Sequence, residues 1–224
     1  MRKREVLDRS TTPDGTLLEL AREAGYYVIR VGHALLMSSA ASASEQHMAV
    51  IARELLGDRP APRILIGGFG MGYTLRAVLD NFGSDAQVTV AELLPALIQF
   101  ARTHLAELAG HALDDPRVEL FEGDVREPIA RGGWDAILLD VDNGPSALTA
   151  ASNASLYSPA GTARLHRALR PGGVLVVWSV APDTRYEARL RAGGFDHKIV
   201  RARARVGKGA THTLFVARPK RSKQ

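Results

Sequence analysis

From residue 63 onward, short apolar runs alternate with longer stretches whose apolar residues recur at helical spacing. The runs read RILIG, QVTVAE, RVELFEG, WDAILLD and GVLVVWS, and the stretches between them include YTLRAVLDNF, PALIQFARTHLAEL and AGTARLHRAL. Continuous apolar runs suit strands that are buried on both faces, and strands separated by helices pair in parallel. The pattern therefore predicts an α/β fold with a mostly parallel sheet covered by helices on both sides.

Both ends of the chain carry further strand signals. After a helix-like stretch at 184–194, the segments 195–206 and 211–219 are joined by a glycine-containing turn, which predicts an antiparallel hairpin at the end of the sheet. Near the N-terminus, alternating residues from Tyr27 to Val31 predict short strands, although a helix at 17–24 is an alternative.

A helix is predicted between these N-terminal strands and the first sheet strand. The segment SASEQHMAVIARELLG has Ser42 or Ser44 as a cap and Gly57 as a stop signal. With 224 residues, 46% of them hydrophobic, the chain can bury one sizeable core. We expect an N-terminal β appendage at 1–42, a Rossmann-like domain at 43–218 and a basic tail at 219–224.

Composition excludes several classes of site. The chain has no cysteine, which rules out disulfides, thiolate metal ligands and a cysteine nucleophile. The histidines show no spacing typical of metal ligands, so no metal is expected. No apolar run approaches the roughly 18 residues that span a bilayer, and no hydrophobic leader follows the charged N-terminus. We expect a cytoplasmic protein without a membrane partner.

The formal net charge of +5 is concentrated near the C-terminus. Arg201, Arg203 and Arg205 alternate as a strand would place them on one face, and the tail RPKRSKQ adds cations. Such a patch could bind nucleic acid, but a solvated strand face and a basic terminus explain it more simply. We do not expect nucleic acid as the partner.

The loop after the first sheet strand is rich in glycine. In a sheet of this kind ligands bind at the carboxyl ends of the strands, and Gly68, Gly70 and Gly72 would let the backbone approach such a ligand. The G-x-G-x-G spacing departs from the dinucleotide fingerprint G-x-G-x-x-G, because Tyr73 occupies the third glycine position. The loop fits an S-adenosylmethionine enzyme better, while tight packing of a turn is the alternative.

Acidic residues end the next three strands at the same edge. Glu92 lies 24 residues past Gly68, close to the roughly 20 expected for an acid that accepts hydrogen bonds from a ribose diol. Asp124 follows the third strand, where it could accept from an adenine amino group or cap a helix. Asp140 follows the fourth strand. We expect Glu92 to face solvent and to contribute little to the core.

Together the blocks ILIGGFGMGYTLRAVL, VTVAELLPALI, DPRVELFEGDVRE, WDAILLDVDNGP, NASLYSPAG and LRPGGVLVVWS resemble the spermidine-synthase-like group of class I S-adenosylmethionine-dependent transferases. The resemblance runs from about residue 32 to 218. It implies a Rossmann-like sheet, a cofactor cradled by residues 68–72, its ribose on Glu92 beside Leu93, and its adenine near Asp124 and Val125. It also implies that Asp140 lies at the reaction centre.

Departures from that group concern mainly acids. The aminopropyltransferases typically have G-G-G-D-G-G in the loop, where this chain has Gly70 and Met71. Their Tyr-His-Glu element is only partly matched by SEQHMAV, which keeps Glu45 and His47 but not the order. Their D-x-x-D-P segment becomes DVDNGP, in which Asp142 and Asn143 only approximate the second acid. A cationic polyamine needs several carboxylates to offset its desolvation.

The expected chemistry is transfer from a sulfonium cofactor. The leading hypothesis is methylation, by S-adenosylmethionine, of an amine or hydroxyl of a small molecule. The alternative is a polyamine aminopropyltransferase that uses decarboxylated S-adenosylmethionine, and a further one is an RNA-binding methyltransferase or a catalytically silent adenosyl-binding module. Asp140 would accept a proton, while Asp142 would orient the acceptor or simply form a turn.

The acceptor site is less well marked in the sequence. Asn143, Tyr157 and Trp178 are candidate substrate-binding residues, although Trp178 at the end of a core strand could serve packing alone. Analogy also suggests a homodimer formed through the N-terminal strands.

Overall fold

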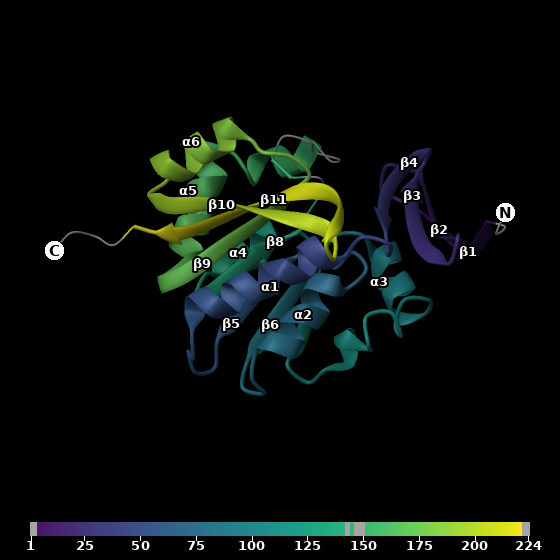
Figure 1. Ribbon diagram of the computed structural model, residues 1–224, viewed down its shortest axis with the longest axis horizontal. Coiled ribbons are helices and arrows are strands. Elements are labelled where there is room, and N and C mark those ends of the chain that lie inside the picture. Colours follow the sequence, from purple (N-terminus) through teal and green to yellow (C-terminus); the bar gives the residue numbers. More distant parts are fainter. Residues whose placement is uncertain (1–3, 142–143, 146–150, 221–224) are drawn as a thin grey trace.

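The computed structural model describes residues 4–141, 144–145 and 151–220, and contains two separate β-sheets (Figure 1). The larger sheet has seven strands in the order β10-β11-β9-β8-β5-β6-β7. Pairing is parallel from β9 through β7, whereas β11 and β10 run antiparallel at the other end. Its strands are β5 (Arg63–Gly67), β6 (Gln87–Glu92), β7 (Val118–Glu122), β8 (Trp134–Leu139), β9 (Leu169–Ser179), β10 (Phe195–Arg205) and β11 (Lys208–Pro219). The predicted fold class is confirmed.

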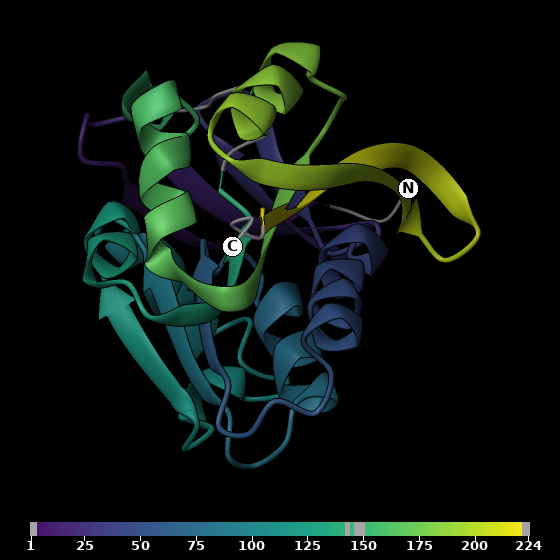
Figure 2. The same ribbon diagram turned by 90° about the vertical axis from the view of Figure 1, so that its left-hand side faces the viewer.

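Helices cover both faces of this sheet, as Figure 2 shows. One face packs against α1 and α2 through a core that includes Met48 and Val78. The opposite face packs against α4, α5 and α6 through residues such as Ile129 and Leu165. The helices are α1 (Ala43–Leu56), α2 (Tyr73–Asn81), α3 (Pro95–Arg102), α4 (Arg126–Arg131), α5 (Pro159–Ala168) and α6 (Thr184–Ala192), with short 3-10 helices at Ala112–Asp114 and Ala151–Ser155.

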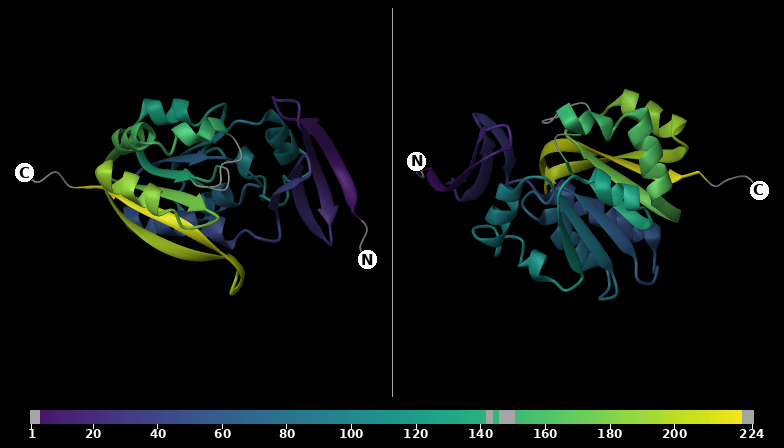
Figure 3. Two further views of the ribbon diagram at one scale, coloured as in Figure 1. Left: turned by 90° about the horizontal axis from the view of Figure 1, so that it is seen from above. Right: turned by 180° about the vertical axis from the view of Figure 1, so that it is seen from behind.

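The smaller sheet is an antiparallel meander at one end of the molecule (Figure 3). It consists of β1 (Glu5–Thr11), β2 (Leu17–Glu23), β3 (Tyr26–Val31) and β4 (Ala34–Ser38). Leu18, Leu20 and Ile29 of this sheet share a core with Leu97 and Phe100 of α3. The sheet is therefore packed onto the main domain, and the domain division at residue 42 stays a prediction.

Three local expectations differ from the structure. Residues 17–23 form a strand rather than a helix, because every residue from Leu18 to Ala21 is buried between β1 and β3. Helix α3 ends at Arg102, six residues before the end of the predicted apolar stretch. Helix α4, which contains Pro128, was not predicted, since its six residues are too few to show a helical period.

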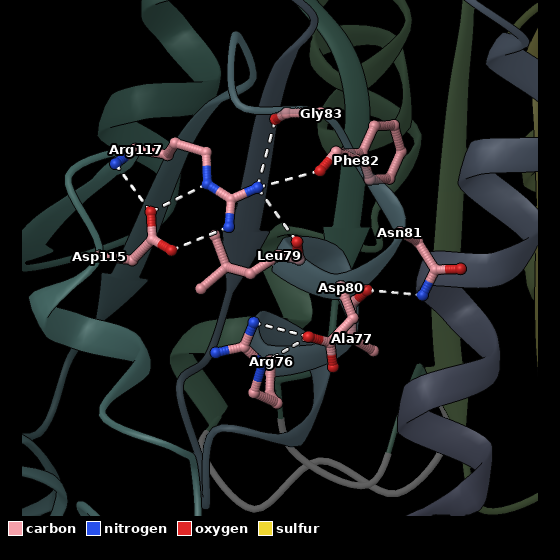
Figure 4. Close-up of polar contacts among 9 residues, drawn as sticks. All are labelled: Arg76, Ala77, Leu79, Asp80, Asn81, Phe82, Gly83, Asp115 and Arg117. Atoms are coloured by element: carbon pink, nitrogen blue, oxygen red, sulfur yellow. Dashed lines mark hydrogen bonds and ion pairs between the residues drawn. The ribbon is translucent and has the colours of Figure 1, made fainter.

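The end of α2 that lies far from the glycine loop is held by Arg117 (Figure 4). Its guanidinium donates to the carbonyl oxygens of Leu79, Phe82 and Gly83, at 3.0, 2.9 and 3.2 Å. Asp115 pairs with the same guanidinium at 2.8 Å, and this contact lowers the pKa of the Asp115 carboxyl to about 2. These bonds satisfy carbonyl groups that a helix C-terminus leaves open.

Candidate active site

The glycine loop connects β5 to α2 at the carboxyl edge of the large sheet. Gly68, Gly70 and Gly72 all have positive φ, at 87°, 56° and 83°. A Cβ on Gly68 would lie 2.4 Å from the carbonyl oxygen of Asp140, and one on Gly72 would lie 2.7 Å from Ala109. Packing alone thus requires glycine at two of these positions, and the same packing sets the loop directly against Asp140.

Gly70 differs from Gly68 and Gly72 because there is space for a Cβ atom at this position. A Cβ there would meet nothing nearer than the sulfur of Met37, at 3.6 Å. Met37 lies on β4, so the N-terminal sheet covers the middle of the loop. This contact gives the N-terminal strands a place in the site that the sequence pattern did not reveal.

Glu92 lies at the end of β6 and holds the loop in place. Its side chain accepts from the backbone N–H of Phe69 and from that of Leu94, both at 2.9 Å. Burial raises the pKa of Glu92, although these N–H groups act in the opposite direction. The expectation of a solvent-facing acid is wrong, because Glu92 is only 6% exposed and ties the loop to the segment after β6. Contact with a ribose stays a prediction.

The residues predicted to lie near an adenine are arranged around the start of α4. Asp124 pairs with Arg126, whose Nε lies 2.9 Å from both carboxylate oxygens, and this pairing lowers the pKa of Asp124. Val125 is buried against Gly67, where a Cβ would lie 2.9 Å from the valine methyl group. Leu93, by contrast, is 46% exposed and offers apolar surface next to Glu92. Their cofactor contacts stay predictions.

Asp140 directly follows β8 and faces the start of α2. Thr74 donates a hydrogen bond to its Oδ2 at 2.9 Å. Burial and the negative charge of Glu45 raise the pKa of Asp140 to about 7. No Lys or Arg forms an ion pair with Asp140 within the described part of the chain. A carboxyl group with a pKa near neutrality can accept or release a proton under physiological conditions.

Glu45, in the first turn of α1, is a site residue that the sequence analysis named but did not select as a candidate. Its carboxylate accepts a hydrogen bond from Ser44 Oγ at 2.6 Å, and burial raises the pKa of Glu45. Ser44 Oγ also accepts from Trp178 Nε1 at 3.0 Å and lies 2.9 Å from His212 Nδ1. The signal in the sequence was the acid in SEQHMAV, which the resemblance to the family element had already pointed to.

The candidate substrate-binding residues fall into two groups. Tyr157 is 1% exposed, its hydroxyl donates to the carbonyl of Val141 at 3.3 Å, and its ring packs edge-on against Tyr186. Trp178 is 9% exposed and bonds Ser44, so packing and support of the site account for it. Asp142 and Asn143 lie outside the described residues. The three substrate-binding roles and the catalytic role of Asp142 stay predictions.

Two absences concern the described residues. None of their helices has the length and apolar character needed to cross a membrane. Within the same ranges, no three His, Asp or Glu side chains converge as ligands for a metal ion.

Comparison with known proteins gives matches in sequence and in fold. No protein-family model matches the chain. Polyamine aminopropyltransferase 2 of Pseudomonas aeruginosa is 36% identical over 129 residues, which cover 55% of this chain and 34% of that protein. The polyamine aminopropyltransferase of Aeropyrum pernix is 29% identical over 177 residues, covering 73% of this chain and 55% of the relative.

Solved structures agree with these relatives at the level of the fold. A crystal structure of a spermidine synthase in complex with the transition-state analogue AdoDATO superposes with a TM-score of 0.75. The match covers 95% of this chain and 72% of the other, at 17% sequence identity. The chain spans between about a quarter and a half of the length of the curated relatives it matches. In sequence and in fold, the chain is therefore similar to the spermidine-synthase-like group, as its motifs predicted.

Proposed function

We propose that the protein transfers an aminopropyl group from decarboxylated S-adenosylmethionine to a primary amine of a polyamine-type acceptor. The observation that carries this proposal is Asp140, whose backbone packs against Gly68 of the loop and whose carboxylate, bonded by Thr74, has no basic partner among the described side chains. A partly buried carboxyl group without a cation favours a positively charged guest. Both substrates of aminopropyl transfer carry positive charge.

The residues around the loop fit the cofactor in chemical terms. Residues 68–72, Glu92 and Leu93 would hold its adenosyl part, since they combine open backbone at Gly70, a carboxylate and exposed apolar surface. A sulfonium cofactor supplies an activated carbon, so the protein needs mainly to position the acceptor and to manage its proton. The decarboxylated form lacks a carboxylate, which suits a site where acids are not offset by a basic side chain.

Asp140 would deprotonate the acceptor. An aliphatic ammonium has no lone pair for attack, and a carboxylate with a pKa of about 7 can take its proton near neutral pH. Thr74 occupies Oδ2 of Asp140, which orients the carboxyl group and leaves Oδ1 for the acceptor nitrogen. Proximity of the acceptor to the reacting carbon then supplies much of the rate acceleration.

Methyl transfer, the leading hypothesis from the sequence, has less support than its alternative. The matched relatives are aminopropyltransferases, and no methyltransferase is among those compared above. Glu45 also supplies an acid beside Asp140, which offsets the loss of acids that had favoured methylation. The acceptor stays within the predicted class, a small-molecule amine.

The test is a transfer assay combined with calorimetric titration. Purified protein would be titrated with S-adenosylmethionine and, separately, with its decarboxylated form. It would then be incubated with each cofactor and 1,4-diaminobutane, and the products identified by mass spectrometry. We expect tighter binding of the decarboxylated form and release of methylthioadenosine. Release of S-adenosylhomocysteine with a methylated amine would instead restore the methyltransferase hypothesis.

A further inference from the structure

Glu45 reaches the reaction centre from a different part of the fold than Asp140. It lies in the first turn of α1, whereas Asp140 follows β8, 95 residues later in the chain. Ser44, the residue before Glu45, accepts a hydrogen bond from Trp178 at the end of β9, and β9 pairs with β8 up to Leu139, the residue before Asp140. Resting on the function proposed above, we propose that Glu45 is a second acceptor-binding acid, which with Asp140 makes the site selective for acceptors with a protonated primary amine.

The hydrogen bonds of Ser44 hold the Glu45 carboxylate in place. A serine hydroxyl has one proton to donate and two lone pairs that accept. Trp178 Nε1 can only donate, so it uses one lone pair, and the 2.6 Å contact with Glu45 uses the proton when Glu45 is ionised. The remaining lone pair then accepts from His212 Nδ1 at 2.9 Å. Every hydrogen-bonding capacity of this buried hydroxyl is used, which fixes the orientation of the Glu45 carboxylate.

The same network orients the Glu45 carboxylate but contains no positive charge to offset it. Burial lowers the pKa of His212, so this imidazole is neutral at physiological pH and does not act as a counter-ion. Trp178 and Ser44 are uncharged donors. By contrast, the mostly buried Glu19 in β2 is paired with both Arg4 and Arg9. Among the described residues, no arginine or lysine forms an ion pair with Glu45. The ammonium group of an acceptor would therefore supply the positive charge that pairs with this carboxylate.

If Glu45 served only to stabilise α1, its pKa would be expected to fall. An acid in the first turn of a helix interacts favourably with the positive end of the helix dipole, which stabilises its ionised form. For Glu45 the pKa is raised instead, because burial outweighs the hydrogen bond from Ser44. The side chain is thus held at the reaction centre in a form that is costly to ionise in the absence of a cation.

Two acids allow the acceptor to bind charged and to react uncharged. The acceptor binds as an ammonium between Asp140 and Glu45 and gives one proton to this pair of carboxylates. The nitrogen lone pair forms a bond to the activated carbon, the carbon–sulfur bond breaks, and its electron pair goes to sulfur, which leaves as a neutral thioether. The product amine regains a positive charge at nitrogen, so the remaining carboxylate charge stabilises the developing ammonium.

The variant Glu45→Gln tests this assignment, since it removes the charge and keeps the shape. Glu54→Gln is the matched control, because Glu54 is exposed on the same helix. Transfer to 1,4-diaminobutane would be measured against pH for both variants and the wild type. For Glu45→Gln we expect the KM for the diamine to rise about 10- to 100-fold, the loss of one charged hydrogen bond, with the KM for the cofactor nearly unchanged.

The pH profile provides a second signature of Glu45. Without its negative charge the pKa of Asp140 falls, so the acidic limb of kcat/KM shifts to lower pH in Glu45→Gln and stays in place in Glu54→Gln. A normal diamine KM together with an unshifted limb in Glu45→Gln would overturn the inference and leave the proposed function intact.

Direct binding separates failure of the inference from failure of the proposed function. Calorimetry would follow 1,4-diaminobutane binding to the wild type and to Glu45→Gln, each saturated with cofactor. If the wild type transfers nothing but binds the diamine in a Glu45-dependent way, the proposed function fails and the acceptor site stands. If the wild type neither transfers to nor binds the diamine, both fail.

Discussion

Two aspartates at opposite ends of strand β8 have opposite surroundings. Asp135, near the start of the strand, is 1% exposed and accepts from Arg59 at 2.5 Å, Arg170 at 3.1 Å and the backbone N–H of Arg63 at 2.8 Å. Asp140, just past the end, has a hydrogen bond from Thr74 and no arginine or lysine among the described residues. Two arginines of the fold offset the negative charge of Asp135, whereas no described arginine or lysine offsets that of Asp140.

A similar contrast holds between acids at the two edges of the sheet, although Asp124 at the carboxyl edge is paired with Arg126. At the amino edge Arg117 lowers the pKa of Asp115, whereas at the carboxyl edge burial raises the pKa of Glu92, Glu45 and Asp140. Acids that carry their own guanidinium stabilise the fold, while acids whose ionised form is disfavoured are candidates for chemistry. The following variants test whether this division holds.

Asp140→Asn should have the largest effect, on activity. Removal of the proton acceptor should lower kcat/KM for amine transfer by about 10²- to 10⁴-fold, the usual contribution of general base catalysis. Stability should be retained, because the variant replaces a carboxyl group that is costly to ionise with a neutral one. Initial rates and chemical denaturation would be measured on the same preparation. Activity within a few-fold of wild type would remove Asp140 from the mechanism.

Asp135→Asn should affect stability instead. It leaves two guanidinium groups without their carboxylate, and we expect a loss of about 2–3 kcal/mol in the free energy of unfolding. Both arginines are partly exposed and can turn to water, which keeps the loss below that of a fully buried pair. Urea titration monitored by circular dichroism measures it. Transfer activity of the folded fraction should stay close to wild type, and a selective loss of activity would break the comparison.

The pH dependence of stability should differ in sign between Asp140 and Asp115. For Asp140 the folded pKa of about 7 exceeds the ordinary 3.8, so its contribution is fully present below about pH 4 and is lost as the pH rises through 7. For Asp115 the folded pKa of about 2 lies below 3.8, so its contribution is present above about pH 4 and is lost as the pH falls through 2.

Thermal melts of the wild type, Asp140→Asn and Asp115→Asn between pH 3 and pH 8 test these signs. The stability gained by Asp140→Asn should grow from pH 4 to pH 7. The stability lost by Asp115→Asn should be constant over that interval and shrink below pH 4. Parallel curves for both variants would mean that the two acids do not differ as described.

Ser44→Ala should have a smaller effect on stability and a distinct one on activity. It strands the buried Trp178 N–H and frees the Glu45 carboxylate, which should cost about 1–3 kcal/mol. Ser42→Ala is the control, because Ser42 is the N-cap of α1 but its side chain makes no capping bond. If Ser44 positions Glu45, its variant should also raise the diamine KM, whereas a purely structural role would lower stability alone.

Prediction from sequence succeeded where the signal was local. The runs RILIG and QVTVAE became β5 and β6 at the predicted residues, because continuous apolar runs require burial on both faces. The position of Glu92 at a strand end followed from the same pattern. Its burial did not, since that depends on how the loop at Phe69 folds back onto it.

The hydrogen-bond network around Ser44 and Glu45 could not be predicted because it is built from distant segments. Ser44 and Trp178 are 134 residues apart, and Ser44 and His212 are 168 residues apart. Their meeting depends on α1 packing across β9 and the C-terminal strands, which no periodicity within α1 encodes. Met37 over Gly70 is a similar case, because only the docking of the N-terminal sheet brings β4 to the loop.

The smallest effect is expected on the C-terminal hairpin, where three arginines form no ion pair with any acid in the described part of the chain. Arg201, Arg203 and Arg205 are exposed, in alternation with buried alanines, and the hairpin tip points toward the N-terminal sheet in Figure 1 and Figure 3. Arg205 lies over the ring of Tyr26, 6.0 Å from its centroid. Because water solvates exposed guanidinium groups, the lack of an acidic partner costs little free energy. The lack of a cationic partner at Asp140 costs more, since that carboxylate is less solvated.

Changing Arg201 and Arg203 together to alanine should therefore alter the free energy of unfolding by less than about 0.5 kcal/mol. Adding Arg205→Ala should cost up to about 1 kcal/mol more through the lost contact with Tyr26. Urea titration of the double and triple variants, with transfer to 1,4-diaminobutane as the activity control, separates these contributions. Strongly salt-dependent RNA binding by the wild type that the triple variant loses would contradict this view. It would mean that charge without an ion-pair partner marks a ligand site on the exposed hairpin as well as at the partly buried Asp140.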